Sequence, residues 1–233
     1  MKHLVLLHGW AMHSEMWGDF ATQLSQHYRV TSVDLPSRDN LNDIADAIVA
    51  ELNDEPFYIL GWSFGGTVAL KIAERFPNQV QGLILMAANP CFVAKENWSG
   101  MPQKTFNTFA EQFHANPATT LQRFLNLQLQ GFPTFLKDVK RRFSSAKHIP
   151  KLADLETSLM LLKTSDLRNV LKKLTCPITA ILSDNDALIP IQIGEKMQAL
   201  QPNLQLITLK NATHIPFITQ PENCLDAIFD AIR

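Results

Sequence analysis

The 233-residue chain is long enough for one large domain with a sizeable core. Its 21 Lys and Arg against 22 Asp and Glu give a net charge of -1, which argues against a nucleic-acid-binding or membrane-surface protein. The three widely spaced cysteines form no disulfide framework, and no apolar run approaches the ~18 residues of a membrane span. We therefore expect a cytoplasmic protein with reduced thiols.

The first half of the chain alternates buried strands with amphipathic helices. Strands are predicted at residues 4–7, 29–34, 57–60 and 82–87, and helices at about 16–24, 44–52 and 67–74. Ser14 is expected to cap the first helix, and Pro77 to end the third. Alternation with short connections predicts an α/β fold, with a mostly parallel sheet and helices on both faces.

This alternation breaks after Cys91. Residues 92–175 contain no convincing strand, only helical patterns that four prolines interrupt. We interpret them as a helical lid inserted into an α/β core of residues 1–91 and 176–233. The lid is rich in bulky apolar residues that together predict the wall of an apolar pocket, among them Phe92, Met101, Phe106, Phe109 and Phe124.

A glycine-rich pentapeptide, Gly61-Trp62-Ser63-Phe64-Gly65, joins the third strand to the third helix. This G-x-S-x-G pattern is the nucleophile elbow, in which a strained serine stands above the sheet. The Phe64 N–H then lies at a helix N-terminus, and the Trp10 N–H, after the first strand, can point to the same place as a second oxyanion donor. The alternative is a strand-to-helix turn whose serine has no catalytic role.

Two further polar groups follow later strands. Strands are predicted at residues 178–182 and 204–209, before a C-terminal helix that starts at Pro221. Asp184 and Asp186 follow the fifth strand, and His214 follows the sixth. The chain order serine, aspartate, histidine is the order expected with this elbow, and all three groups lie at the carboxyl ends of strands.

The order and spacing of these motifs resemble the α/β-hydrolase family over nearly the whole chain. Several shorter stretches are similar to the pimeloyl-[acyl-carrier protein] methyl ester esterases of biotin synthesis. They are Leu60-Gly61-Trp62-Ser63, Asn89-Pro90-Cys91-Phe92, Glu96-Asn97-Trp98, Arg123-Phe124-Leu125, residues 162–168 and residues 214–218. The resemblance implies a serine carboxylesterase that needs no metal or cofactor and acts on an ester borne on acyl carrier protein. We expect it to be a monomer.

The resemblance also implies roles for single residues. Ser63 would be the nucleophile, His214 the base and Asp186 the acid, because the spacing of Asp186 to Pro190 matches the family. Trp10 and Phe64 would form the oxyanion hole. Substrate contacts would come from these two residues, from Ser63 and His214, and from the lid residues Phe124, Leu125, Asn126, Leu127 and Gln128. The chain departs from the family in entering its first strand without an antiparallel hairpin and in having Phe64 where leucine is expected.

Basic residues concentrate in the lid. Residues 92–168 hold 11 Lys and Arg against 6 Asp and Glu. The functional interpretation is a surface that docks an acidic carrier protein, and the alternative is a solvated helix face. The basic residues expected to contribute are Arg123, Lys137, Lys140, Arg141, Arg142 and Lys147.

Two other functions stay open at this point. One is a general short-chain carboxylesterase or C–C hydrolase on the same scaffold. The other is a non-catalytic ligand receptor, against which the complete set of Ser63, Asp186 and His214 argues.

Overall fold

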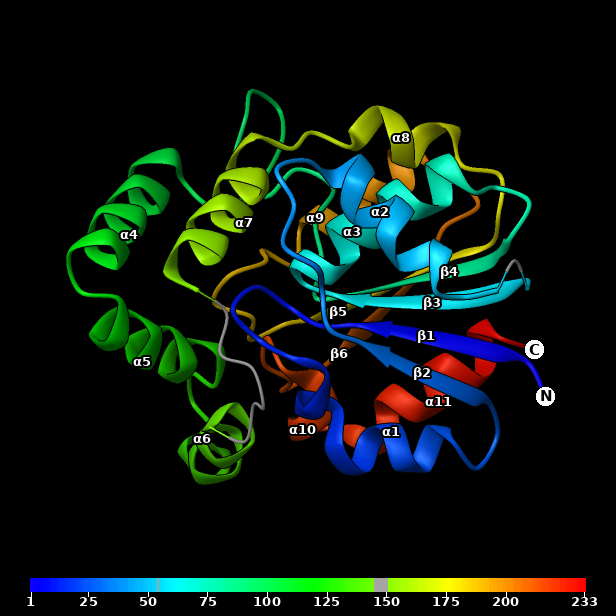
Figure 1. Ribbon diagram of the computed structural model, residues 1–233, viewed down its shortest axis with the longest axis horizontal. Helices are drawn as coiled ribbons and strands as arrows, with labels where there is room; N and C mark the ends of the chain where they lie inside the picture. The colour runs from blue at the N-terminus through cyan, green and yellow to red at the C-terminus, as the bar shows by residue number, and fades with distance from the viewer. Residues whose placement is uncertain (54, 145–150) are drawn as a thin grey trace.

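The computed structural model describes residues 1–53, 55–144 and 151–233. In this part of the chain six parallel strands form one sheet in the order β2-β1-β3-β4-β5-β6 (Figure 1). The strands are β1 (His3–Leu7), β2 (Arg29–Val33), β3 (Phe57–Trp62), β4 (Val80–Met86), β5 (Ile178–Ser183) and β6 (Gln205–Leu209). The predicted α/β architecture is confirmed.

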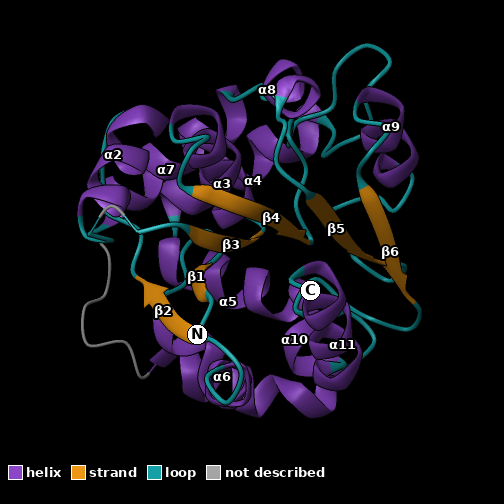
Figure 2. Ribbon diagram, turned by 90° about the vertical axis from the view of Figure 1, so that its right-hand side faces the viewer, coloured by secondary structure: helices purple, strands orange, loops and turns teal. Residues whose placement is uncertain are grey.

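Helices cover both faces of the sheet, as Figures 1 and 2 show. Successive side chains of β1 point to opposite faces of the sheet, so both faces need a cover. Leu4 and Leu6 pack into one core cluster, whereas Val5 and Leu7 pack into the other. One face carries α2 (Leu41–Ala50), α3 (Phe64–Arg75), α8 (Arg168–Lys173) and α9 (Ile193–Leu200). The other carries a 3₁₀ turn (Ser14–Trp17), α1 (Gly18–Leu24), α10 (Pro216–Thr219) and α11 (Pro221–Ala231).

Parallel pairing brings the carboxyl ends of distant strands to one edge. Leu7 at the end of β1 pairs with Gly61 of β3, and Ser183 at the end of β5 pairs with Leu209 of β6. The strand order reverses at β1, which lies between β2 and β3. The loops after β1, β3, β5 and β6 therefore start at the same edge, next to the point where sheets of this kind bind ligands.

The lid lies beyond that edge (Figure 1). Among its described residues there is no strand, only two isolated bridges, Val93 with Met101 and Lys95 with Trp98. Its helices are α4 (Gln103–Ala115), α5 (Pro117–Gln128), a 3₁₀ turn (Pro133–Phe135), α6 (Leu136–Ser144) and α7 (Leu152–Thr164). The sequence division also assigns α8 to the lid, but α8 packs against α3 and α9 of the core.

Two local expectations are corrected or refined by the structure. Ser14 does not cap α1: it begins a 3₁₀ turn, and its backbone N–H donates to Asp34 at 2.6 Å. The second helix starts earlier than its apolar spacing indicates, because the Asn40 side chain accepts from the Asp43 N–H at 3.0 Å and so caps α2. Nowhere in the described chain is a helix long and apolar enough to cross a membrane.

Candidate active site

The turn between β3 and α3 has the geometry of a nucleophile elbow. Ser63 has φ 55 and ψ -118, a left-handed backbone conformation that non-glycine residues rarely adopt. A β-carbon on Gly65 would overlap the Leu7 carbonyl, and one on Gly61 would overlap the backbone of Gly65. The two glycines of the motif are therefore required by the close packing of α3 against β1 and β3.

Ser63, His214 and Asp186 form one chain of hydrogen bonds. His214 Nε2 lies 3.0 Å from Ser63 Oγ. Its Nδ1 lies 2.8 Å from Asp186 Oδ2 and 3.0 Å from Oδ1. The side chains of His214 and Asp186 are each only 1% exposed. This arrangement orients the imidazole so that Nε2 can take the serine proton.

Neighbouring groups hold the histidine and the acid in place. The Trp62 indole N–H donates to the His214 carbonyl at 2.8 Å. Asp186 Oδ1 accepts the backbone N–H groups of Leu188 and Ile189 at 2.8 and 3.0 Å. The alternative acid, Asp184, is exposed, and the carboxylate that contacts His214 is that of Asp186.

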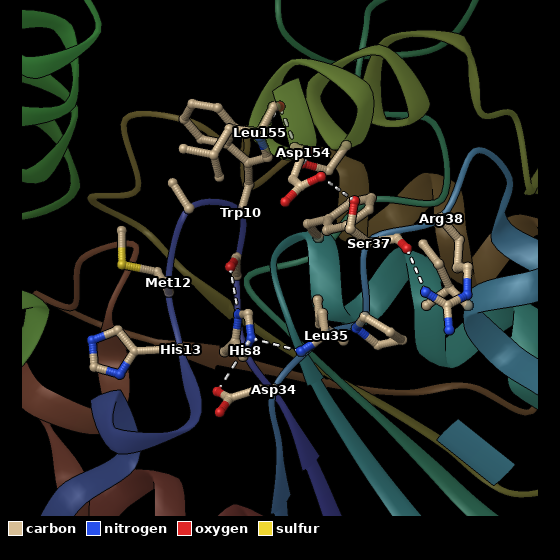
Figure 3. Close-up of a pocket in the computed structure, with 16 residues that line it drawn as sticks. His8, Trp10, Met12, His13, Asp34, Leu35, Ser37, Arg38, Asp154 and Leu155 are labelled. Atoms are coloured by element: carbon tan, nitrogen blue, oxygen red, sulfur yellow. Dashed lines mark hydrogen bonds and ion pairs between the residues drawn. The ribbon is translucent and has the colours of Figure 1, made fainter. Parts of the chain in front are cut away.

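A buried histidine supports the turn that follows β1. Figure 3 shows His8 between two loops: its Nδ1 lies 2.8 Å from the Gly9 carbonyl, and its Nε2 accepts the Leu35 N–H at 3.0 Å. The ring is therefore neutral, with the proton on Nδ1, and burial lowers the pKa of His8 to about 4. These bonds fix the backbone that carries Trp10, the second expected oxyanion donor. As the first residue of α3, Phe64 has an N–H without an acceptor in its own helix.

Two cavities flank the side chain of Trp10. The roomier one, about 240 Å³, lies between the loop after β1, residues 34–38 and α7, and its lining does not include Ser63 (Figure 3). The smaller one, about 80 Å³, includes Ser63 and is otherwise almost entirely apolar. Its lining is Trp10, Ser63, Phe92, Met101, Thr105, Phe106, Phe109, Phe124, Leu127, Leu159, Leu162 and Leu188. The apolar lining of the smaller cavity suits an acyl chain, and we call this space the acyl cavity.

Only part of the expected lid stretch lines the acyl cavity. Phe124 and Leu127 line it, three residues apart on α5. Leu125 and Gln128 instead face away and are buried, and Asn126 is exposed outside the cavity lining. Helical spacing turns these three side chains away from the acyl cavity, so the lining does not support their expected contact with substrate, which stays a prediction. Phe64 lines the roomier cavity instead.

Sequence reasoning missed one wall of this cavity. Leu159 and Leu162 on α7 and Leu188 in the loop after Asp186 all line it. The signal for α7 was its apolar spacing at Leu155, Leu159 and Leu162, which fits one helix face. Leu188 had no periodic signal, because it lies in a loop.

The basic lid residues fall into two groups. Arg142 is only 14% exposed at its side chain, bonds to Asp138 at 2.8 Å and donates to the Met16 carbonyl at 3.3 Å. It therefore anchors α6 to the core, which corrects its expected place on a docking surface. Arg141 is exposed and also pairs with Asp138.

The second group has no ion pair among the described residues. Arg123 and Lys137 are exposed, and Lys140 is half-buried. Lys147 lies outside the described residues.

Sequence comparison identifies the family. Residues 2–221 match the family model described as alpha/beta hydrolase fold. The chain belongs to the α/β-hydrolase family. Within this family it is 34% identical to the pimeloyl-[acyl-carrier protein] methyl ester esterase of Proteus mirabilis, over 94% of this chain and 88% of the relative. It is 36% identical to the enzyme of the same name from Nitrosomonas europaea, over 97% and 94% of the two chains. The resemblance seen in the motifs is confirmed.

Solved structures agree with this α/β-hydrolase assignment at the level of the fold. An esterase from Exiguobacterium antarcticum superposes with a TM-score of 0.88 at 21% identity, over 99% of this chain and 91% of the esterase. A bromoperoxidase from Bacillus anthracis gives a TM-score of 0.87 at 18% identity, with the same coverage. At these identities the likeness concerns the fold alone.

The first prediction separates the two candidate acids of this α/β hydrolase. Asp186→Asn should lower kcat by about 10⁴, because an amide cannot hold the histidine tautomer that accepts the serine proton. Asp184→Asn should stay within a few-fold of wild type, since that side chain is exposed. Steady-state kinetics on a chromogenic ester measure both, with circular dichroism as the folding control. The reverse ranking of the two variants would refute the assignment of Asp186.

A second prediction concerns the buried His8. The folded protein protonates this ring only near pH 4, whereas the unfolded chain does so near 6.5. The unfolded state therefore binds more protons between these values, and the free energy of unfolding should fall as the pH drops from 6.5 to 4. The contribution of this one group is on the order of 3 kcal/mol.

Urea unfolding of wild type and His8→Gln across this pH range measures the effect. The variant keeps an acceptor near the Leu35 N–H but does not titrate, so its stability should depend less on pH. Parallel curves for the two proteins would show that His8 does not cause the acid sensitivity.

Proposed function

We propose that this protein hydrolyses the methyl ester of a pimeloyl chain carried on acyl carrier protein, as a serine esterase. The observation that carries the proposal is the hydrogen-bonded set of Ser63, His214 and Asp186 at the end of an apolar cavity. The chain that carries this set is 34–36% identical, over nearly its full length, to enzymes named for that reaction.

The first half of the reaction forms an acyl-enzyme. His214 Nε2 accepts the proton of Ser63 as the serine oxygen bonds to the ester carbonyl carbon. The Trp10 and Phe64 N–H groups donate to the carbonyl oxygen as it becomes an oxyanion. Asp186 stabilises the imidazolium. His214 then gives its proton to the methoxy oxygen as the carbon–oxygen bond breaks and methanol leaves.

The second half repeats these roles with water. His214 accepts a proton from water as the hydroxide bonds to the acyl carbon, and the same two N–H groups hold the new oxyanion. The bond to Ser63 Oγ then breaks, and His214 returns the proton to the serine. The acyl chain leaves with a free carboxylate. No step needs a metal or a cofactor.

Charge on the lid supports a carrier-borne substrate. Arg123, Lys137 and Lys140 have no ion pair with any described residue, and Arg141 stays exposed beside Asp138. We assign these four residues to the docking of an acidic carrier, whereas Arg142 serves as an anchor. Exposed charges of this kind act mainly on the association rate.

The nucleophile is tested by removing its hydroxyl. Ser63→Ala should abolish hydrolysis of both the carrier-bound methyl ester and a nitrophenyl ester, because no other group can form the acyl-enzyme. A fluorophosphonate should label wild type at Ser63 alone, located by peptide mass spectrometry. Activity that survives in the alanine variant would reject the serine esterase mechanism. Equal kcat/KM of wild type for carrier-bound and free methyl esters would instead favour a general esterase.

Carrier docking is tested by reversing two lid charges. Lys137→Glu with Lys140→Glu should raise KM for the carrier-bound ester, so that the ratio of its kcat/KM to that of a nitrophenyl ester falls several-fold. The increase in KM should fade as salt is raised, because exposed charges are already screened beyond about 8 Å at physiological ionic strength. The matched control reverses Lys172 and Lys173, exposed on α8 of the core, and should leave this ratio at the wild-type value. A ratio that falls equally in the control would reject docking on α6.

A further inference from the structure

Three of the stretches that resemble the esterases have no part in the proposed reaction steps. They are residues 89–92 and 96–98, where the chain enters the lid, and residues 162–168, where it returns to the core. The structure brings all three together at the base of the lid. Leu167 donates its N–H to the Pro90 carbonyl at 2.7 Å, so the two ends of the lid are hydrogen-bonded to each other.

A buried asparagine organises the entry to the lid. Asn89 is only 3% exposed. Its Oδ1 accepts the Cys91 N–H at 3.0 Å and the Trp98 indole N–H at 2.9 Å, and its Nδ2 donates to the Ser99 carbonyl at 3.1 Å. These directional bonds fix the buried ring of Trp98 against the first segment of the lid.

A cluster of ion pairs joins this ring to the exit from the lid. The Arg168 guanidinium lies over the Trp98 ring, 5.4 Å from its centre, and binds both carboxylate oxygens of Asp166 at 2.8 and 2.7 Å. Lys95, on the entry side, donates to the same carboxylate at 3.0 Å. The hydrogen bonds from Arg168 keep the pKa of Asp166 well below its usual range, so this carboxylate stays ionised. We call Asn89, Lys95, Trp98, Asp166 and Arg168 the base clamp.

The base clamp is attached to the core at two points. Arg168 is the first residue of α8, which packs against α3 and α9. The Lys196 ammonium of α9 donates to the Asn97 carbonyl at 2.9 Å, which ties the turn that carries Trp98 to the core. Both ends of the lid therefore leave the core from fixed positions.

Two sides of the acyl cavity lie close to the base clamp in the chain. Phe92 and Met101 line the cavity from the entry side, and Leu162 lines it from the last turn of α7 on the exit side. Each of the three is within four residues of a member of the clamp. The contacts that join the two ends of the lid thus also fix the segments that carry opposite parts of the cavity wall.

We propose that the base clamp holds the two sides of the acyl cavity together and thereby sets how strongly the protein binds a long acyl chain. The structure describes all five members, and none of them lines the cavity, so they are positioning residues. The proposal rests on the proposed function, because it concerns the acyl chain of the ester that Ser63 attacks. Methylene groups gain binding free energy from apolar walls around them, and an acetyl group has no such chain to bury.

The test removes the charge at the centre of the clamp. Asp166→Asn keeps the shape of the side chain but not the ion pairs with Lys95 and Arg168. We expect kcat/KM for nitrophenyl hexanoate to fall about four- to fifteenfold, through KM, as for the lost burial of one or two methylene groups. The value for nitrophenyl acetate and the rate of fluorophosphonate labelling at Ser63 should stay near those of wild type.

The matched control removes a pair of the same kind from the core. Arg75 of α3 binds both carboxylate oxygens of Asp46 on α2 at 2.8 and 2.7 Å, and this pair is partly exposed like that of the clamp. Asp46→Asn should keep the wild-type ratio of kcat/KM for hexanoate to kcat/KM for acetate. Urea unfolding of both variants compares their stability losses, so that a weaker fold is distinguished from a changed cavity.

A second variant tests the buried part of the clamp. Trp98→Phe keeps a ring beneath the Arg168 guanidinium but removes the indole N–H that Asn89 accepts. The ratio of hexanoate to acetate should fall here too, by a smaller factor than in Asp166→Asn. A wild-type ratio in either folded clamp variant would overturn the proposal, as would an equal fall in the Asp46→Asn control.

Failure of the proposed function gives a different result. If wild type does not hydrolyse the carrier-bound methyl ester while the chain-length effect of the clamp variants is present, only the carrier-bound substrate is rejected and the clamp proposal stands. If Ser63→Ala still hydrolyses nitrophenyl esters, the serine esterase mechanism is rejected and the clamp proposal with it.

Discussion

The strained backbone at Ser63 is the constraint on which the site depends. A positive φ at a non-glycine residue costs on the order of 1–3 kcal/mol and persists only where its surroundings impose it. Here they do, because α3 begins in contact with the Leu7 carbonyl through Gly65 and with β3 through Gly61. Any larger residue at these glycines would move α3 away from β1, and with it the Phe64 N–H away from Trp10.

The sheet supplies the rest of the geometry by topology alone. Ser63 and His214 are 151 positions apart in the chain, yet β3 and β6 end at one edge because every strand between them is parallel. The indole of Trp62, the residue before Ser63, donates to the His214 carbonyl. Ser63 and His214 are thus held to each other by backbone and by side chain, and their geometry is a property of the core rather than of the lid.

The difference between a core arranged by sheet topology and a lid arranged by helix docking explains what could be predicted from the sequence. The elbow and the strand ends follow from local patterns and from parallel topology, so the sequence suffices for them. Topology left Asp184 and Asp186 as alternatives, and the choice of Asp186 came from the resemblance to the family in its spacing to Pro190. For the lid, local patterns predicted only helices with many apolar and basic residues, and its single substrate contacts were taken from the resemblance. Leu125 and Leu127 are equally apolar, and only the docking of α5 decides that Leu127 lines the acyl cavity. Arg142 differs from Lys140 for a similar reason: Gly18, with φ 46, leaves space for its guanidinium.

Trp10 links the lid to the turn that follows β1. Its ring lies edge-on to Phe109, Phe113 and Phe124 at centroid distances of 5.2–5.6 Å, contacts that tolerate small shifts of α4 and α5. Its indole N–H donates to the Leu155 carbonyl of α7 at 3.0 Å, a directional bond that fixes the ring. Its backbone is held by the turn that His8 supports. The aromatic contacts can therefore adjust to small shifts of α4 and α5 while the indole ring and the backbone of Trp10 stay in place.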